Sequence, residues 1–199
     1  MLKLIQVLAA WSSKFMELSS ICSQLSISRP SIESYIKAIE TLYLVDRVRA
    51  WHKTDYDRVS KQEKLFLTDT GMLYSILNWR FDSMRFDADM SGKLLETFVY
   101  NQIAAIIDAQ TESYEIYHYR DREKREIDFI IENDDKALLG IEVKASAVVD
   151  KAMFKHLIWF KNNIAKEKAF TGIVLYTGEH LIPFGSDLWA VPIACLWEE

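Results

Sequence analysis

The stretch from Ser91 to Ser146 constrains the fold most strongly, because two different hydrophobic periodicities follow each other in it. Apolar residues first recur every three or four positions, which predicts an amphipathic helix whose start is marked by Gly92. They are Leu94, Leu95, Phe98, Val99, Ile103, Ile106 and Ile107. Three β-rich runs follow, at residues 114–120, 126–132 and 137–144. Because short charged turns separate these runs, they predict a three-stranded meander.

Four charged residues lie on the predicted helix and on the second and third predicted strands. Glu96 lies near the apolar face of the helix, and Asp128 lies in the middle of the second strand. Glu142 and Lys144 are two residues apart on the third strand, so they point to the same face, because side chains alternate along a strand. The pattern therefore predicts a carboxylate and an ammonium group side by side.

A helix Glu, a strand Asp and a strand Glu-Val-Lys in this order resemble the PD-(D/E)XK nuclease superfamily over about half of the chain. The resemblance implies a restriction endonuclease-like αβββαβ domain with a metal site. Asp128 and Glu142 would hold Mg²⁺ or Mn²⁺, and Glu96 would be an outer or water-mediated ligand. Lys144 would be the catalytic lysine that orients water and steadies developing charge. The superfamily's name refers to a Pro-Asp pair on this strand. This chain has Glu126-Ile127-Asp128 there, so the proline is absent.

Two hypotheses follow for this domain. In the first it is a metal-dependent DNA phosphodiesterase, an endo- or exodeoxyribonuclease. In the second it is a non-catalytic DNA- or protein-binding output domain that keeps the nuclease fold as a scaffold, since one fold hosts many functions. The four retained site residues favour the first hypothesis, and the acidic composition favours the second.

The N-terminal part predicts a helical module that ends in a hairpin. Helices are expected over residues 2–11 and 18–25, and a third begins at the N-cap Ser28 with Pro30 in its first turn. Its buried face is expected to consist of Ile32, Tyr35, Ile36, Ile39 and Leu42. With strands at 43–51 and 64–68, this order resembles a winged helix-turn-helix. The chain is thus predicted to be α/β, α+β overall, with a winged-helix domain and linker at 1–85 and the nuclease-like domain at 86–199.

Polar residues on the outer side of the third helix and in the wing are the candidates for DNA contact. They are Arg29, Ser31, Ser34 and Lys37 on the helix and Lys53 and Arg58 in the wing. The acidic residues Glu33 and Glu40 lie on the same helix as these basic residues, and Asp55 and Asp57 lie in the wing. They reduce the positive charge of both segments. We therefore expect contacts with phosphates and little reading of base edges.

The net charge of −5 is unevenly distributed. Residues 1–75 carry ten basic and eight acidic side chains, whereas residues 76–199 carry fourteen and twenty-one. Affinity for DNA rests largely on Lys and Arg, which release counterions from the phosphates. The chain alone is therefore expected to bind DNA weakly and in a salt-dependent way.

A second resemblance spans nearly the whole chain. It rests on Thr-Asp-Thr-Gly-Met at 68–72, Gly-Lys-Leu-Leu-Glu at 92–96, and the strands with Asp128 and Glu142. Together they are similar to the uncharacterised C-terminal region of a family of prokaryotic AAA+-type ATPases. This implies an ATPase domain as a partner, in cis or in trans. The sequence has no Gly-x-x-x-x-Gly-Lys-Thr loop, so the chain is either part of a longer protein or has lost that domain. Asp69-Thr70-Gly71 also marks aspartic proteases, but the second Asp that their dyad requires is missing.

Beyond the meander, a helix is predicted over residues 150–164 with Met153, Phe154, Leu157, Ile158 and Phe160 on its apolar face. The run 170–176 predicts a strand in the sheet interior beside the strand with Glu142. Residues 188–196 predict a last strand that Pro192 confines to an edge. Lys155 and His156 lie near the start of this helix, where they would either contact phosphate or be ordinary surface residues.

Cys22 and Cys195 lie far apart in apolar contexts, which predicts buried thiols in a reducing compartment. No apolar run approaches the length of a membrane span. A soluble, cytoplasmic protein is therefore expected, and the oligomeric state stays open.

Overall fold

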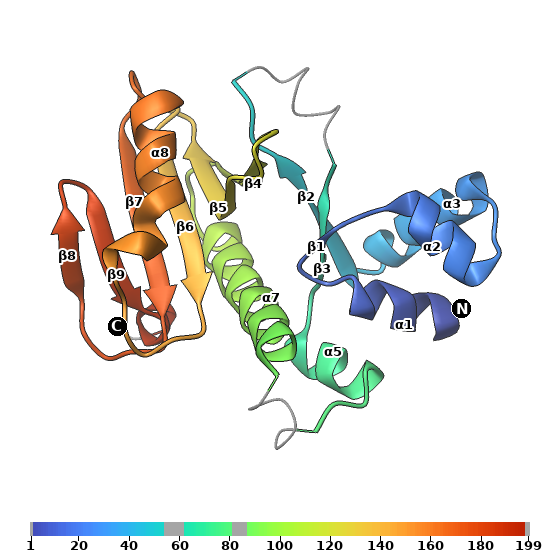
Figure 1. Cartoon of the computed structure of the whole chain (residues 1–199). Helices are drawn as coiled ribbons and strands as arrows, with labels where there is room; N and C mark the ends of the chain where they lie inside the picture. The colour runs from blue at the N-terminus through green and yellow to red at the C-terminus, as the bar shows by residue number, and fades with distance from the viewer. Residues whose placement is uncertain (1, 54–61, 81–86, 198–199) are drawn as a thin grey trace. The chain divides into compact units, whose positions relative to one another are not determined.

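The computed structural model describes residues 2–53, 62–80 and 87–197 (Figure 1). The chain divides into two compact units. The described part of the first unit comprises residues 2–49, 62–80 and 87–101, and that of the second comprises 50–53 and 102–197. The described residues form nine strands and several helices, so the predicted mixed α/β class is confirmed. The predicted domain boundary near residue 85 lies outside the described residues and stays a prediction.

The first unit contains helices and a small antiparallel sheet. Its helices are α1 (Leu2–Ala10), α2 (Leu18–Leu25), α3 (Arg29–Thr41) and α5 (Thr70–Ile76). Its strands are β1 (Lys14–Phe15), β2 (Val45–Ala50) and β3 (Lys64–Leu67), which pair antiparallel with β3 between β1 and β2. The predicted helices and hairpin are therefore present in the predicted order, while their assignment to a winged helix stays a prediction.

The turn between α2 and α3 follows from local chemistry. Ser26 closes α2 in the left-handed conformation with φ of 54°, and Pro30 fits the first turn of α3 because its fixed φ is helical. Ser28 occupies the N-cap position as predicted, but its side chain makes no capping bond to the backbone. Its hydroxyl lies 2.9 Å from the hydroxyl of Ser31 instead.

The buried face of α3 is narrower than predicted. Ile32, Ile36 and Ile39 are buried in the core of the first unit. Tyr35 is 43% exposed and Leu42 is 66% exposed, so the prediction was wrong for both. Tyr35 lies at the margin of the Ile stripe, and Leu42 follows the last helical residue, where the helical periodicity no longer determines its direction.

Helix α7 spans Ala88–Asp108, and its residues belong to both units. It begins one turn before Gly92, so the predicted start was wrong. Asp87 provides the N-terminal cap, because its Oδ1 accepts hydrogen bonds from the backbone N–H groups of Asp89 and Met90. Ile106, predicted on the apolar face, is exposed.

The second unit is a six-stranded sheet in the order β4-β5-β6-β7-β9-β8. The strands are β4 (Tyr114–Arg120), β5 (Glu126–Asn133), β6 (Leu138–Lys144), β7 (Phe170–Tyr176), β8 (Ile182–Gly185) and β9 (Leu188–Pro192). β4, β5 and β6 form the predicted antiparallel meander. β7 lies parallel to both β6 and β9, which confirms its predicted interior position. The nuclease-like fold itself stays a prediction.

The C-terminal end of the sheet differs from the prediction. β9 lies between β7 and β8 and is not an edge strand. Pro192 is the last residue of β9, so its missing N–H falls where the ladder ends and does not exclude the strand from the interior. The strand β8, which the sequence analysis missed, forms the edge, and residues 193–196 form the 3-10 helix η2 (Ile193–Leu196).

Helix α8 (Lys155–Asn163) follows the 3-10 helix η1 (Lys151–Phe154) and packs on one face of this sheet (Figure 1). Phe160 is its central buried residue, and its ring lies 5.3 Å from that of Trp51 and 4.8 Å from that of Tyr119. A Cβ at Gly140 would lie 2.8 Å from Leu157 Cδ2, so the close approach of α8 requires glycine there. Ile158 is exposed, against the prediction, because the buried stripe runs through Phe154, Leu157 and Phe160.

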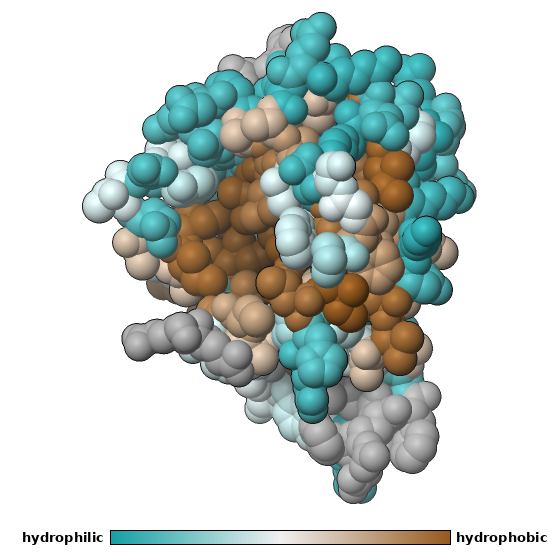
Figure 2. All heavy atoms as spheres, turned by 90° about the vertical axis from the view of Figure 1, so that its left-hand side faces the viewer, coloured by the Kyte–Doolittle hydropathy of each residue, from teal (hydrophilic) through white to brown (hydrophobic). Residues whose placement is uncertain are grey.

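The surface of the second unit carries apolar side chains near β8. Figure 2, viewed from the side on which β8 lies in Figure 1, shows a hollowed apolar area. Ile182 of β8 and Trp189 of β9 are among the exposed apolar residues of this unit.

Cys195 is exposed and Cys22 is half-buried, so the prediction of buried thiols was wrong. Among the described residues, no helix has the length and apolar character needed to cross a membrane.

A buried carboxylate that the sequence analysis missed connects Trp51 to the sheet. Glu132 on β5 is 3% exposed, and its Oε2 accepts a 2.7 Å hydrogen bond from the Trp51 indole N–H. Lys136 Nζ lies 3.0 Å from its Oε1, and Lys168 Nζ lies 3.7 Å from its Oε2. These cations offset the cost of burying the negative charge.

We expect Glu132→Ala to lower the free energy of unfolding by about 2 kcal/mol, because the buried indole loses its carboxylate acceptor. Glu132→Gln keeps an acceptor and should lose less. Urea unfolding followed by circular dichroism measures both, with the exposed Glu167→Ala as control. A Glu132→Ala protein as stable as the control would refute this role.

Candidate functional site

A β-bulge on β5 lies at the predicted aspartate. Tyr117 pairs with Ile130 and Tyr119 pairs with Ile127, so Asp128 and Phe129 together lie opposite the single residue His118. A bulge changes the direction of the side chains that it contains. It also explains why Ile127 and Ile130, an odd number of residues apart, both pack in the same core.

The Asp128 carboxylate lies against the neighbouring strand. The ladder between β5 and β6 has Phe129–Ile141 as its terminal pair, next to Asp128. There, Asp128 Oδ2 accepts a 2.8 Å hydrogen bond from the Val143 backbone N–H. The structure therefore brings Asp128 to the Glu-Val-Lys segment.

Glu142 and Lys144 are side by side, as the alternation of β6 predicts. Lys144 Nζ lies 2.7 Å from Glu142 Oε2. The Glu142 side chain is 6% exposed, whereas that of Lys144 is 33% exposed. The carboxylate is thus fixed in the sheet, and the ammonium group remains within reach of solvent.

His156, whose role the sequence left open, lies beside the same carboxylate. Its Nδ1–H donates a 2.9 Å hydrogen bond to the Glu126 backbone carbonyl. The same nitrogen lies 3.9 Å from Glu142 Oε1. Because α8 packs on the face of β6 that carries Glu142, its second residue reaches the site. Lys155, the preceding residue, is exposed.

Glu96 belongs to the first unit and has a cationic partner there. Its Oε1 lies 2.9 Å from Nζ of Lys64 on β3, whose side chain is 2% exposed. The ammonium of Lys64 also lies 5.2 Å from the centre of the Phe15 ring. The predicted metal-ligand role of Glu96 stays a prediction, and this buried ion pair was missed by sequence reasoning.

The donor set of the second unit suits a hard cation. Asp128 and Glu142 offer carboxylate oxygens, and Mg²⁺ is typically bound by one or two carboxylates together with waters and substrate phosphate. Within residues 2–53, 62–80 and 87–197, no group of three or more His, Cys, Asp or Glu side chains is arranged to hold a metal ion.

The candidate DNA contacts on α3 are accessible, but one of them is paired. Arg29 Nε lies 2.9 Å from Glu33 Oε1, and this hydrogen bond raises the pKa of Arg29 above its usual value. Ser31 is hydrogen-bonded to Ser28. Ser34, Lys37 and Lys53 are exposed, and Arg58 lies outside the described residues. Their role in binding DNA stays a prediction.

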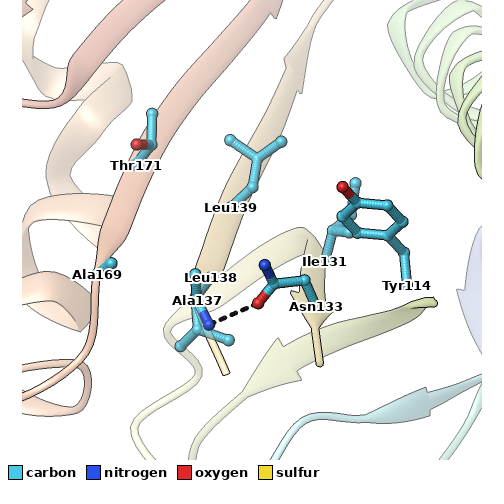
Figure 3. A pocket seen from close by; sticks show the side chains of 8 residues that line it. All are labelled: Tyr114, Ile131, Asn133, Ala137, Leu138, Leu139, Ala169 and Thr171. Carbon is cyan, nitrogen blue, oxygen red and sulfur yellow. Dashed lines mark hydrogen bonds between the residues drawn. The ribbon is translucent and has the colours of Figure 1, made fainter. Parts of the chain in front are cut away.

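A separate hollow of about 360 Å³ lies at the other end of β5 from Asp128 (Figure 3). Its lining includes Tyr114, Ile131, Leu139 and Thr171, and Asn133 Oδ1 accepts a hydrogen bond from Ala137 N there. The lining has no charged side chain. The polar groups of this hollow are thus the neutral side chains of Tyr114, Asn133 and Thr171.

The fold and this site define a mixed α/β protein with an Asp and a Glu-x-Lys on neighbouring strands and a His on the helix that packs over them. Residues 91–196 match the family described as Domain of unknown function (DUF4143). Because this match covers more than half of the chain, the protein belongs to that family. Residues 1–83 match Domain of unknown function (DUF8612).

Two mycobacterial relatives match almost the whole chain. They are Uncharacterized protein Mb2031c of Mycobacterium bovis and Uncharacterized protein Rv2008c of Mycobacterium tuberculosis, each 22% identical over 189 residues. The match covers 94% of this chain and 40% of each relative, so the chain spans well under half of their length.

A solved structure is distantly similar. A chain in the tetradecameric assembly of Thermococcus gammatolerans McrB AAA+ hexamers with bound McrC matches 80% of this chain and 59% of its own length. The sequence identity is 8% and the TM-score is 0.36. A similarity of this size does not assign a fold.

Proposed function

We propose that the second unit is a PD-(D/E)XK-type, metal-dependent phosphodiesterase that acts on DNA. The observation that carries this proposal is that Asp128 is bonded to the backbone of Val143, between the paired residues Glu142 and Lys144, where the ladder between β5 and β6 ends. Lys144 Nζ is 2.7 Å from Glu142 Oε2, and Asp128 Oδ2 is 2.8 Å from Val143 N. This group has the residue types and the order on which the resemblance to that superfamily rests.

Asp128 and Glu142 would hold Mg²⁺ or Mn²⁺, which when bound supplies charge stabilisation at the scissile phosphate. Lys144, one third exposed, can donate to a phosphate oxygen and so stabilise the charge that develops there. In the structure its ammonium is held by Glu142, which keeps it at the site. The hydrogen bond from His156 Nδ1–H to the Glu126 carbonyl fixes the orientation of the imidazole ring beside Glu142.

We also propose that the first unit is a winged helix that positions DNA weakly through α3, and that an ATPase domain acts with the chain in cis or in trans. Exposed Lys37 on α3 supports the first part. The second part is supported by the sequence resemblance to the C-terminal region of AAA+-type ATPases. The mycobacterial relatives, of which this chain covers 40%, are long enough to contain a further domain.

The test is a metal titration combined with a cleavage assay. Millimolar Mn²⁺ or Mg²⁺ should raise the melting temperature, because an ion that binds only the folded state stabilises it by about 2.7 kcal/mol at a hundred times its Kd. Asp128→Asn should abolish both this shift and cleavage of supercoiled, linear, single-stranded or branched DNA. Asp134→Asn, in an exposed turn, is the matched control. No shift and no cleavage in the unaltered protein would refute the proposal.

A non-catalytic output domain is the second candidate. The observation that favours it is the engagement of Glu96 by Lys64, which leaves two carboxylates for the metal in the second unit. This function predicts DNA or protein binding that is unaffected by Asp128→Asn.

A further inference from the structure

A groove of about 590 Å³ lies in the second unit beside the proposed hydrolytic site. One wall is the turn between β4 and β5, with Lys124 and Arg125, and the other is α8, with Lys155, His156, Trp159 and Asn162. This volume falls in the range of about 300 to 1,000 Å³ that is usual for ligand sites. The proposed function uses none of these residues except His156.

The groove contains a flat platform. The Arg125 guanidinium carbon lies 3.7 Å from the centre of the Trp159 ring, which is a cation–π stack. Asp121 holds the guanidinium through a 2.7 Å bond to Arg125 Nε, and Glu123 also pairs with it. Asp121 Oδ1 further accepts from the backbone N–H groups of Glu123 and Arg125. The platform is therefore fixed before any ligand arrives.

The platform has a neutral aromatic support. The Tyr119 ring lies 6.4 Å from that of Trp159. Burial, and then the charge of Asp121, raise the pKa of Tyr119 to about 12. A tyrosine is uncharged at neutral pH even at its ordinary pKa of about 10, so this phenol adds no negative charge behind the stack.

The charge of the groove opposes that of the chain. Its lining carries the cations of Lys124, Arg125 and Lys155 and the carboxylate of Glu123, and Asp121 behind Arg125 adds a second carboxylate. These groups leave an excess of one positive charge, whereas the whole chain has a net charge of −5. Lys124 and Lys155 are exposed. Cations beside a stacking surface are the features with which proteins hold unpaired nucleic acid strands.

The groove leads to the proposed hydrolytic site. His156 lines the groove, and its Nδ1 lies 3.9 Å from Glu142 Oε1. A strand in the groove would therefore be separated from Glu142 by the side chain of His156.

We propose that this groove binds an unpaired nucleic acid strand, with one base stacked on the Arg125–Trp159 platform and the flanking phosphates at Lys124 and Lys155. This inference rests on the proposed function and gives its substrate class: single strands, or duplexes with a frayed or single-stranded end. Bases within an intact duplex are stacked on each other, so they cannot use the platform.

The test measures binding separately from cleavage. The 199-residue chain carrying Asp128→Asn is titrated in EDTA by fluorescence anisotropy with three probes. They are a single-stranded oligonucleotide, the same sequence as a blunt duplex, and an abasic strand of equal length. The single strand should bind about tenfold more tightly than either of the others. In this background Trp159→Ala should remove the preference over the abasic strand, while Trp159→Phe should keep most of it. Trp189→Ala, a partly exposed tryptophan on β9, is the matched control.

Removal of the lysine cations should weaken the binding of all the nucleic acid probes alike. Lys124→Ala with Lys155→Ala should reduce the salt dependence of binding by about 1.4 in slope, since each phosphate that a cation neutralises on a single strand accounts for about 0.7. Equal affinity for duplex and single strand, or equal competition by polyglutamate, would overturn the inference. If the protein cleaves DNA but Trp159→Ala does not change the preference for the normal strand over the abasic strand, the proposed role of the groove is wrong and the proposed function stands. Trp159-dependent binding without cleavage by the unaltered protein would support the groove and refute the hydrolytic proposal.

Discussion

Glu96→Ala is expected to lower the free energy of unfolding by about 3 kcal/mol in the absence of any metal. Lys64 Nζ lies 2.9 Å from Glu96 Oε1, and the Lys64 side chain is 2% exposed. Removal of one partner of a buried ion pair leaves a charge in a medium that solvates it poorly, which is more costly than the loss of a surface pair. The size of the effect follows from the burial of the lysine.

Urea unfolding in EDTA measures this change, with Asp108→Ala at the exposed end of α7 as control. The double variant Lys64→Met with Glu96→Leu should recover most of the stability, since apolar replacement of a buried pair is often neutral. The experiment also separates two roles of Glu96. If Glu96→Ala leaves the metal-free protein unchanged but weakens metal binding, Glu96 is a ligand, as the sequence resemblance implies, and the structural role is refuted.

Lys144→Ala is expected to reduce DNA cleavage at least 100-fold while Mn²⁺ binding stays nearly unchanged. Its ammonium would stabilise charge on the phosphate in the transition state, and loss of one such donor costs about 2.7 to 4 kcal/mol of barrier. Glu142→Ala should lose both metal binding and cleavage, because the carboxylate is a proposed ligand. The two variants therefore distinguish the roles of groups that lie 2.7 Å apart.

Single-turnover cleavage at saturating Mn²⁺ and calorimetric titration of the metal give the two quantities. Lys151→Ala, an exposed lysine in η1, is the control. Lys144→Arg keeps the charge and should retain part of the rate. If Lys144→Ala and the control cleave every substrate equally well, the phosphodiesterase proposal fails and the binding-domain alternative takes its place.

Several features of this protein follow from the sequence by itself, because they depend on local periodicity. β4 has the predicted bounds Tyr114–Arg120, since β-branched and aromatic residues end there at a charged turn. Glu142 and Lys144 were predicted on one face from strand alternation alone, and Lys144 Nζ lies 2.7 Å from Glu142 Oε2. The short turn between α2 and α3 and the start of α3 also follow from the local sequence, namely from Pro30 and its neighbours.

Other features were decided only by the tertiary structure. The bulge at Asp128 depends on how β5 registers against β4, and the partner of Glu96 is Lys64, which is 32 residues away in the chain. His156 meets Glu142, and Arg125 meets Trp159, only because α8 packs over this part of the sheet. Periodicity determines which face of an element a residue occupies, but strand register and helix packing determine what that face contacts, and these depend on the shapes of many buried side chains at once.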